Sequence, residues 1–137
     1  MVDVANVMGA RADGWWRDRA GAALRLCREV IALARRGDGP GGDWVLVLEG
    51  RAREAAPLLA AELAGTGPAV PAVPVPAVPV QVVTAPGSGD DAIVGVVTEA
   101  AARDQSCLVV TADRELRQRC EELNASVAGP GWLLRLL

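Results

Sequence analysis

Four short apolar runs, separated by longer segments with helical spacing, constrain the fold of this chain more than any other feature of its sequence. The runs cover about residues 1–4, 44–48, 78–84 and 107–111. Apolar runs of this length are typical of parallel strands that are buried on both faces. The alternation with helical segments predicts an α/β fold. We expect a Rossmann-like, three-layer αβα arrangement around a mostly parallel sheet of about four or five strands.

Capping residues and glycine-rich turns give the expected bounds of the helices. Residues 9–17 are expected to form a loop, after which Asp18 can cap a helix that ends at the glycine-rich segment 37–42. A second helix is expected at about residues 51–63, where Pro57 should delay its start or kink it. The remaining expected elements are helices that begin at about residues 88–90 and 113, and a short strand at 125–128.

A proline-valine repeat interrupts this pattern between the second helix and the third strand. It covers residues 68–80 and favours polyproline II, because its prolines cannot donate to a β ladder. The chain has 137 residues and is 51% hydrophobic, which suffices for one core. We therefore expect residues 1–137 to form a single domain, in which the repeat is an expanded linker. A role of the repeat in binding other proteins is the weaker alternative.

Composition excludes several kinds of catalytic site. The chain has no His, which removes Ser-His and Cys-His pairs and His-ligated zinc. All 14 basic residues are Arg, so a receiver-type signalling domain, which needs a Lys, is also excluded. Cys27, Cys107 and Cys120 form no C-x-x-C pair and are expected to be buried thiols in a reducing compartment. With no visible signal peptide or apolar span, we expect a cytoplasmic protein that does not enter a membrane.

Charge is distributed unevenly along the chain. The net charge of −3 argues against a wholly basic nucleic-acid binder. However, residues 11–36 carry an excess of arginine, whereas residues 37–137 carry an excess of acids. A basic helix beside an acidic cleft would suit a polyanion that is steered towards a metal ion. A solvated helix face explains the same pattern equally well.

Carboxylates lie at or just beyond the ends of the expected strands and at one helix start. In open α/β sheets the ligand crevice lies outside the carboxyl ends of the strands, so acids that are distant in sequence are expected to converge there. Carboxylate oxygens suit hard cations such as Mg²⁺ and Mn²⁺. Of the paired acids at positions 90 and 91, one is expected to cap its helix, and we expect Asp91 to face the crevice. The candidate metal ligands are Asp3, Glu49, Asp90, Asp91 and Asp113.

Each of these acids also has an ordinary structural interpretation. Asp3 and Asn6 can be turn residues, Glu49 can pair with a nearby arginine, and Asp113 can be a helix cap. The segment Thr111–Arg114 is the strongest local indication of a site, because a hydroxyl, a carboxylate and a phosphate-binding guanidinium follow one buried strand. Trp15 and Trp16 lie in the expected first loop, where they can stack on bases or cover the core.

These motifs, in this order, resemble the PIN-like superfamily, and its NYN and YacP-like branch most. The resemblance rests on Val-Asp-x-x-Asn at 2–6, an acid after the second strand, Gly-Asp-Asp-Ala-Ile at 89–93 and Val-Val-Thr-Ala-Asp-Arg-Glu-Leu-Arg at 109–117. It implies a Rossmann-like fold and a ribonuclease site that depends on Mg²⁺ or Mn²⁺. Carried over by position, the catalytic acids are Asp3, Asp91 and Asp113, with Glu49 where relatives often have Asp. Asn6, Thr111 and Arg114 would support them.

The resulting hypothesis is a metal-dependent endoribonuclease that hydrolyses phosphodiesters with metal-activated water. Arg114, Arg17 and Arg19 would position the RNA backbone. The expected partner is RNA, such as tRNA or ribosome-associated RNA, and a homodimer is one option for the assembly. The alternatives are a nucleotide pyrophosphohydrolase that uses the same acids on small nucleotides, and a non-catalytic PIN-like module that binds RNA or protein.

Overall fold

Five parallel strands form one sheet in the order β3-β2-β1-β4-β5, with helices on both faces. The computed structural model describes residues 1–65 and 79–137. Its elements are β1 (Val2–Asp3), α1 (Val4–Gly9), the 3₁₀ helix η1 (Trp15–Arg17), α2 (Arg19–Arg36), β2 (Trp44–Leu48), the 3₁₀ helix η2 (Gly50–Ala55), α3 (Ala56–Leu63), β3 (Val80–Thr84), α4 (Gly89–Ala102), β4 (Leu108–Val110), α5 (Arg114–Glu121), β5 (Ser126–Ala128) and α6 (Pro130–Leu134).

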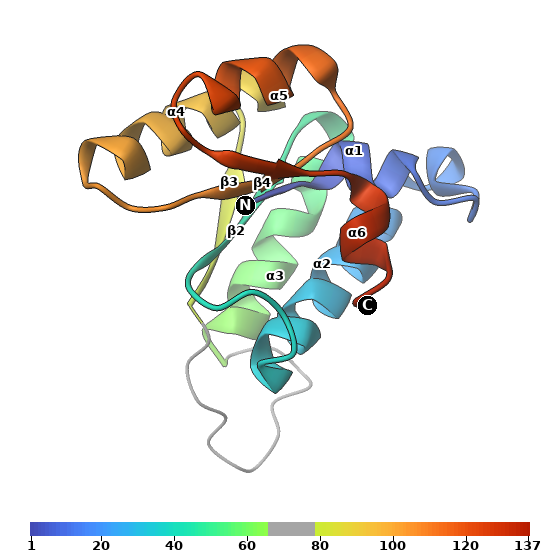
Figure 1. Cartoon of the computed structure of the whole chain (residues 1–137). Helices are drawn as coiled ribbons and strands as arrows, with labels where there is room; N and C mark the ends of the chain where they lie inside the picture. Colours follow the sequence, from blue (N-terminus) through green and yellow to red (C-terminus); the bar gives the residue numbers. More distant parts are fainter. Residues whose placement is uncertain (66–78) are drawn as a thin grey trace.

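The helices form two outer layers, each with its own core against the sheet. Helices α4 and α5 lie on one side of the sheet, and α1, α2, α3 and α6 lie on the other (Figure 1). The larger core, on the side of α2, is represented by the buried residues Val7, Leu26, Leu59 and Leu133. The smaller core, on the side of α4, is represented by Ile93, Val97, Leu116 and Cys120. The predicted three-layer, Rossmann-like αβα fold is therefore confirmed.

The first strand is much shorter than predicted. We expected a strand over residues 1–4, but β1 contains only Val2 and Asp3, and a helix that the sequence analysis had not predicted follows at once. The cause is Asp3, whose side chain accepts a hydrogen bond from the backbone N–H of Asn6 and so caps α1. The expected loop over residues 9–17 is correspondingly shorter, because α1 extends to Gly9 and η1 covers its end.

Most other predicted bounds are confirmed within one or two residues. Asp18 caps α2 through the N–H of Gly21. Pro57 delays the second helix as predicted: a 3₁₀ helix occupies residues 50–55, and α3 begins only at Ala56. The strand expected at 107–111 is trimmed to Leu108–Val110, whereas β5 lies within the expected range. The C-terminal apolar tail forms α6.

The structure also bears on the expectations for the cysteines, the proline-valine repeat and membrane-spanning segments. Cys27 and Cys120 are buried and Cys107 is partly buried, and all three are free thiols. Of the proline-valine repeat, residues 68–78 lie outside the described residues. Within the described part of the chain, no helix combines the length and the apolar character that crossing a membrane requires.

The strand order places the end of β1 at the centre of the sheet. β1 lies between β2 and β4, and Val2 pairs with Leu46 on one side and with Val110 on the other. The chain winds from β1 towards β3 and then crosses back to β4, so the winding direction reverses between β1 and β4. Ligands of open α/β sheets bind at this switch point. Asp3 and the residues that follow β4 therefore occupy the position where the fold itself favours a site.

Candidate functional site

A cavity of about 580 Å³ lies beyond the carboxyl ends of the strands. We call it the acidic cavity, because four carboxylates from separate segments line it and no basic residue does. Its lining residues are Asp3, Ala5, Asn6, Gly9, Ala10, Glu49, Ser88, Asp90, Ala112 and Asp113. The predicted convergence of acids at the sheet edge is confirmed for four of the five candidates.

Asp3 is the most firmly held of these acids. It is 7% exposed, and its two carboxylate oxygens accept separate hydrogen bonds. Oδ1 accepts from the backbone N–H of Asn6 at 3.1 Å, and Oδ2 accepts from the hydroxyl of the fully buried Thr111 at 2.8 Å. Burial is nevertheless the dominant effect, and it raises the pKa of Asp3, with a smaller contribution from the charge of Glu49. Thr111 thus holds a carboxylate of the cavity.

Asp113 and Asn6 link the ends of β1 and β4. The side chain of Asp113 accepts from the N–H of Leu116 at 2.9 Å and caps α5, as the ordinary interpretation predicted. The same residue also lines the acidic cavity, so capping does not remove it from the site. Asn6 Oδ1 accepts from the N–H of Ala112 at 3.1 Å, and the Thr111 hydroxyl oxygen accepts from the N–H of Asp113 at 3.2 Å. Asn6 therefore fixes the loop after β4 relative to α1.

The acidic pair on α4 is oriented opposite to our prediction. We expected Asp91 to face the crevice, but its side chain is 74% exposed and pairs with Arg119 at 2.9 Å. Asp90 lines the cavity instead. The reason is the start of the helix: Ser88 occupies the N-cap position and makes no side-chain cap bond, so Asp90 is not the cap and lies in the first turn. Successive residues on a helix point about 100° apart, so only one of the pair can face the cavity.

Glu49 connects β2 to the start of α4. Its Oε2 accepts from the N–H of Gly89 at 2.7 Å, so the carboxylate occupies the position of a helix cap that Ser88 leaves open. A Cβ at Gly89 would lie 2.8 Å from the same oxygen, which explains the glycine. Gly89 belongs to the motif at 89–93, but its role beside Glu49 was not predicted from the sequence. The ordinary alternative for Glu49 is wrong, because Arg51 pairs with Glu54 instead and Arg53 bonds to backbone carbonyl oxygens.

The acids repel one another across the cavity. Burial raises the pKa of Asp90 most, and the charges of Asp113, Asp3 and Glu49 raise it further. The side chain of Asp90 makes no hydrogen bond or ion pair with any residue in the described ranges. An all-oxygen, all-anionic set of donors fits the chemistry of Mg²⁺ or Mn²⁺. However, in the part of the chain that the structure describes, no three Asp, Glu or Cys side chains are already grouped closely enough to hold an ion.

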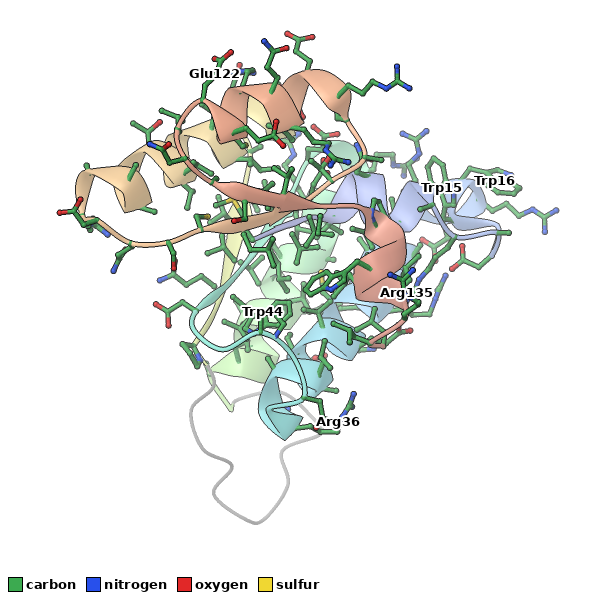
Figure 2. The ribbon with its side chains drawn as sticks, in the orientation of Figure 1. Trp15, Trp16, Arg36, Trp44, Glu122 and Arg135 are labelled. Carbon is green, nitrogen blue, oxygen red and sulfur yellow. The ribbon has the colours of Figure 1, made fainter. Side chains whose placement is uncertain are left out.

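The predicted substrate-binding arginines lie outside the acidic cavity. Arg114 is exposed at the first position of α5, directly after the cavity residue Asp113, and neither Glu115 nor Glu122 forms an ion pair with it. Arg17 and Arg19 are exposed at η1 and at the start of α2. They accompany Trp15 and Trp16, which lie together at one end of the molecule (Figure 2).

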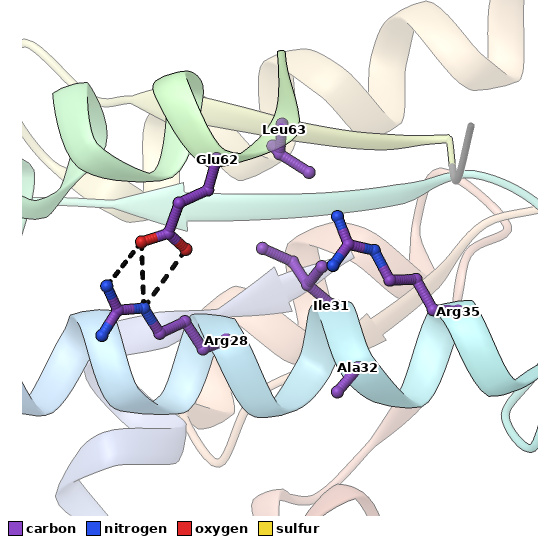
Figure 3. Close-up of a pocket in the computed structure, with 6 residues that line it drawn as sticks. All are labelled: Arg28, Ile31, Ala32, Arg35, Glu62 and Leu63. Atoms are coloured by element: carbon purple, nitrogen blue, oxygen red, sulfur yellow. Dashed lines mark hydrogen bonds and ion pairs between the residues drawn. The ribbon is translucent and has the colours of Figure 1, made fainter. Parts of the chain in front are cut away.

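A second cavity, of about 260 Å³, lies between α2 and α3 and differs in its chemistry. We call it the helix–helix cavity. Arg28 donates to both carboxylate oxygens of Glu62, and the aliphatic parts of Ile31 and Leu63 line the rest (Figure 3). Arg35 also lines it, and its charge contributes to a lowered pKa of Glu62, for which the hydrogen bond from Arg28 is the main cause. The one carboxylate of this cavity is thus paired with an arginine, and Arg35 adds a second positive charge. These residues were not among the predicted site residues.

Comparisons of this chain with protein-family models, with curated proteins and with solved structures found no match.

Proposed function

We propose that this protein is a divalent-metal-dependent ribonuclease whose site is the acidic cavity. The observation that carries the proposal is the convergence of Asp3, Glu49, Asp90 and Asp113 from four segments at the switch point of the sheet. Fixed carboxylates without a basic partner in the same cavity are costly unless a cation joins them. The motif order that resembles the PIN-like superfamily supports the same conclusion independently of the cavity.

Each acid has a distinct part in the proposed reaction. Asp3, held by Asn6 and Thr111, and Asp113, held by the N–H of Leu116, would provide rigid oxygen ligands. When bound, Mg²⁺ or Mn²⁺ would neutralise phosphate charge and lower the pKa of water. Glu49 would add a ligand while it fixes the start of α4.

Asp90 is the proposed proton carrier. Its side chain lines the cavity, and burial is the main cause that raises its pKa above that of an ordinary Asp. It makes no bond to neighbouring side chains in the described residues, so it is available to pass a proton to the leaving oxygen of the phosphodiester. Arg114, beside the cavity, would bind a substrate phosphate.

The test is cleavage of a mixed RNA pool with Mn²⁺, with EDTA as one control and Asp113→Asn as another. Free nucleoside triphosphates are assayed in parallel. The proposal predicts RNA cleavage that requires the metal and is lost in Asp113→Asn. RNA cleavage that persists undiminished in Asp113→Asn would contradict the site, and turnover of nucleotides alone would contradict the substrate.

Each of the two alternative functions is favoured by a separate observation. A volume of about 580 Å³ lies within the range of about 300–1,000 Å³ that is common for small-molecule sites, which favours a nucleotide pyrophosphohydrolase. The lack of a ready three-ligand group among the described residues favours a non-catalytic binding module. The parallel assay separates these alternatives, since the first turns over free nucleotides and the second turns over nothing.

A further inference from the structure

One large aromatic side chain, on the 3₁₀ helix η1, is held out in solvent. Trp16 is 58% exposed, in a chain that has four Trp and no Phe or Tyr. The only other large hydrophobic side chain that is exposed in the described residues is Leu58, which lies on α3. Trp16 is therefore not part of a contiguous apolar patch of the kind that docks another protein.

The neighbouring Trp15 anchors this side chain to the site. Trp15 is partly buried and packs against the larger core. Its Cζ2 atom lies 3.9 Å from the position that a Cβ would take on Gly9, and Gly9 lines the acidic cavity. The rings of Trp15 and Trp16 meet edge to face, with centroids 6.1 Å apart and an angle of 85°. The exposed ring is thus one aromatic contact away from the rim of the cavity.

The local backbone holds the two rings in this arrangement. Gly14 adopts a left-handed conformation with φ of 76°, which turns the chain into η1. The carboxylate of Asp13 accepts from the N–H of Trp15 at 3.2 Å. The hydrogen bond and the packing hold Trp15, and Trp16 lies beside it at the end of the molecule (Figure 2).

Two exposed arginines, Arg17 and Arg19, lie in the same segment as the two rings. Arg19 lies over the ring of Trp15, 5.3 Å from its centroid, and Arg17 follows Trp16 directly. Neither arginine forms an ion pair with a residue in 1–65 or 79–137. The acids of the same segment form no ion pair with these arginines: Asp13 accepts from the N–H of Trp15 and Asp18 from the N–H of Gly21, and both keep their negative charge.

From this arrangement we infer that Trp16 stacks on an unpaired base of a single-stranded RNA, whose adjacent phosphates contact Arg17 and Arg19. Aromatic platforms beside arginines are how proteins hold single strands without reading sequence. A duplex keeps its base faces stacked, so it cannot use Trp16 in this way. The inference rests on the proposed function for the direction of the strand, which would enter the acidic cavity past Gly9.

Binding is measured separately from cleavage, by fluorescence anisotropy of a labelled single-stranded RNA dodecamer in EDTA. The same RNA annealed to its complement is the comparison ligand. The wild type is expected to bind the single strand at least tenfold more tightly than the duplex. Trp16→Ala should weaken single-strand binding about tenfold and leave duplex binding nearly unchanged, whereas Trp16→Phe should keep most of the affinity.

Two further variants make the test specific. Leu58→Ala removes the other exposed large side chain and should bind like the wild type. Arg17→Ala should reduce the salt dependence of single-strand binding, by about 0.7 in the slope of log K against log salt concentration. Circular dichroism and thermal unfolding of all variants check that each one folds.

The inference is overturned if Trp16→Ala binds the single strand like the wild type, or if it loses affinity for the single strand and the duplex equally. It is also overturned if Trp16→Phe binds as weakly as Trp16→Ala, or if the wild type binds no RNA. Failure of the proposed function looks different. In that case the wild type binds the single strand through Trp16 but cleaves no RNA with Mn²⁺. Conversely, metal-dependent cleavage without any effect of Trp16 on binding keeps the ribonuclease and removes the stacking platform.

Discussion

The two cavities of this protein place charged side chains in opposite ways. In the helix–helix cavity Arg28 donates to both oxygens of Glu62, and the pKa of Glu62 is lowered. In the acidic cavity four carboxylates face one another with no basic lining residue, and the pKa values of Asp3 and Asp90 are raised. The carboxylate of the helix–helix cavity is paired with an arginine of the same cavity, whereas the four carboxylates of the acidic cavity have no basic residue in its lining. Unpaired carboxylates therefore distinguish the candidate site from the groove between α2 and α3.

The strongest test of this comparison is the pair of neighbouring acids on α4. Asp90→Asn is expected to lower metal-dependent RNA cleavage about 100-fold or more, because it removes the proposed proton carrier. Asp91→Asn, which alters only an exposed pair with Arg119, should stay within about twofold of the wild type. Initial cleavage rates of both variants measure this. The reverse order would mean that Asp91 faces the substrate, as the sequence analysis had predicted.

The hydrogen bond from Thr111 to Asp3 should contribute to the stability of the folded protein. Thr111→Val removes the hydroxyl that donates to Asp3 Oδ2 and accepts from the N–H of Asp113. The free energy of unfolding at pH 7 should fall by about 1–3 kcal/mol, because a buried carboxylate loses its partner. Urea denaturation measures this, and Thr111→Ser, which keeps the hydroxyl, should retain more of the stability. Equal stability of Thr111→Val and the wild type would show that the bond to Asp3 is unimportant.

Because the acids of the acidic cavity repel one another, we expect that removing one of them increases the stability of the fold, and that the increase depends on pH. The folded-state pKa of Asp90 lies above its ordinary value of 3.8, so the folded protein holds this proton more tightly than the unfolded chain. The stability from that proton is fully present below about pH 3.8 and is lost as the pH rises through the folded-state pKa.

Asp90→Asn should therefore raise the Tm at pH 7, and raise it less near pH 4. Excess Mn²⁺ should raise the Tm of the wild type more than that of the variant. Thermal unfolding across this pH range tests both statements. A Tm difference that shrinks as the pH rises would contradict the direction of the pKa shift.

The smallest effect is expected at the ion pair between Arg28 and Glu62. Arg28→Ala breaks the pair with Glu62, in which the Arg28 side chain is 51% exposed. Exposed ion pairs contribute about 0–1 kcal/mol, so the free energy of unfolding should fall by no more than that. RNA cleavage should not change. A loss of cleavage in Arg28→Ala would bring the helix–helix cavity into the function and end the contrast between the two cavities.

The fold could be predicted from the sequence because its signals are local and repeated. Apolar runs at 44–48 and 107–111, together with the helical spacing between them, indicated buried parallel strands and crossover helices. The caps at Asp18 and Asp113 followed from side-chain chemistry alone. The first strand was predicted too long, because its apolar residues fit a helix as well and the cap by Asp3 decided between the two.

The sequence by itself determined that acids at the ends of parallel strands would meet, since that follows from the topology of any such sheet. Only the tertiary structure decided which acids face the cavity. The choice between Asp90 and Asp91 depends on the residue at which α4 begins, and that start depends on Glu49, which is 40 positions away and bonds to the N–H of Gly89. Likewise, the sequence does not distinguish Trp15 from Trp16. In the structure the ring of Trp15 packs against the core, whereas Trp16 is largely exposed. Neighbouring residues on a helix point about 100° apart, so the choice between the two acids follows from the face of α4 that packs on the sheet, where Ile93 and Val97 are buried.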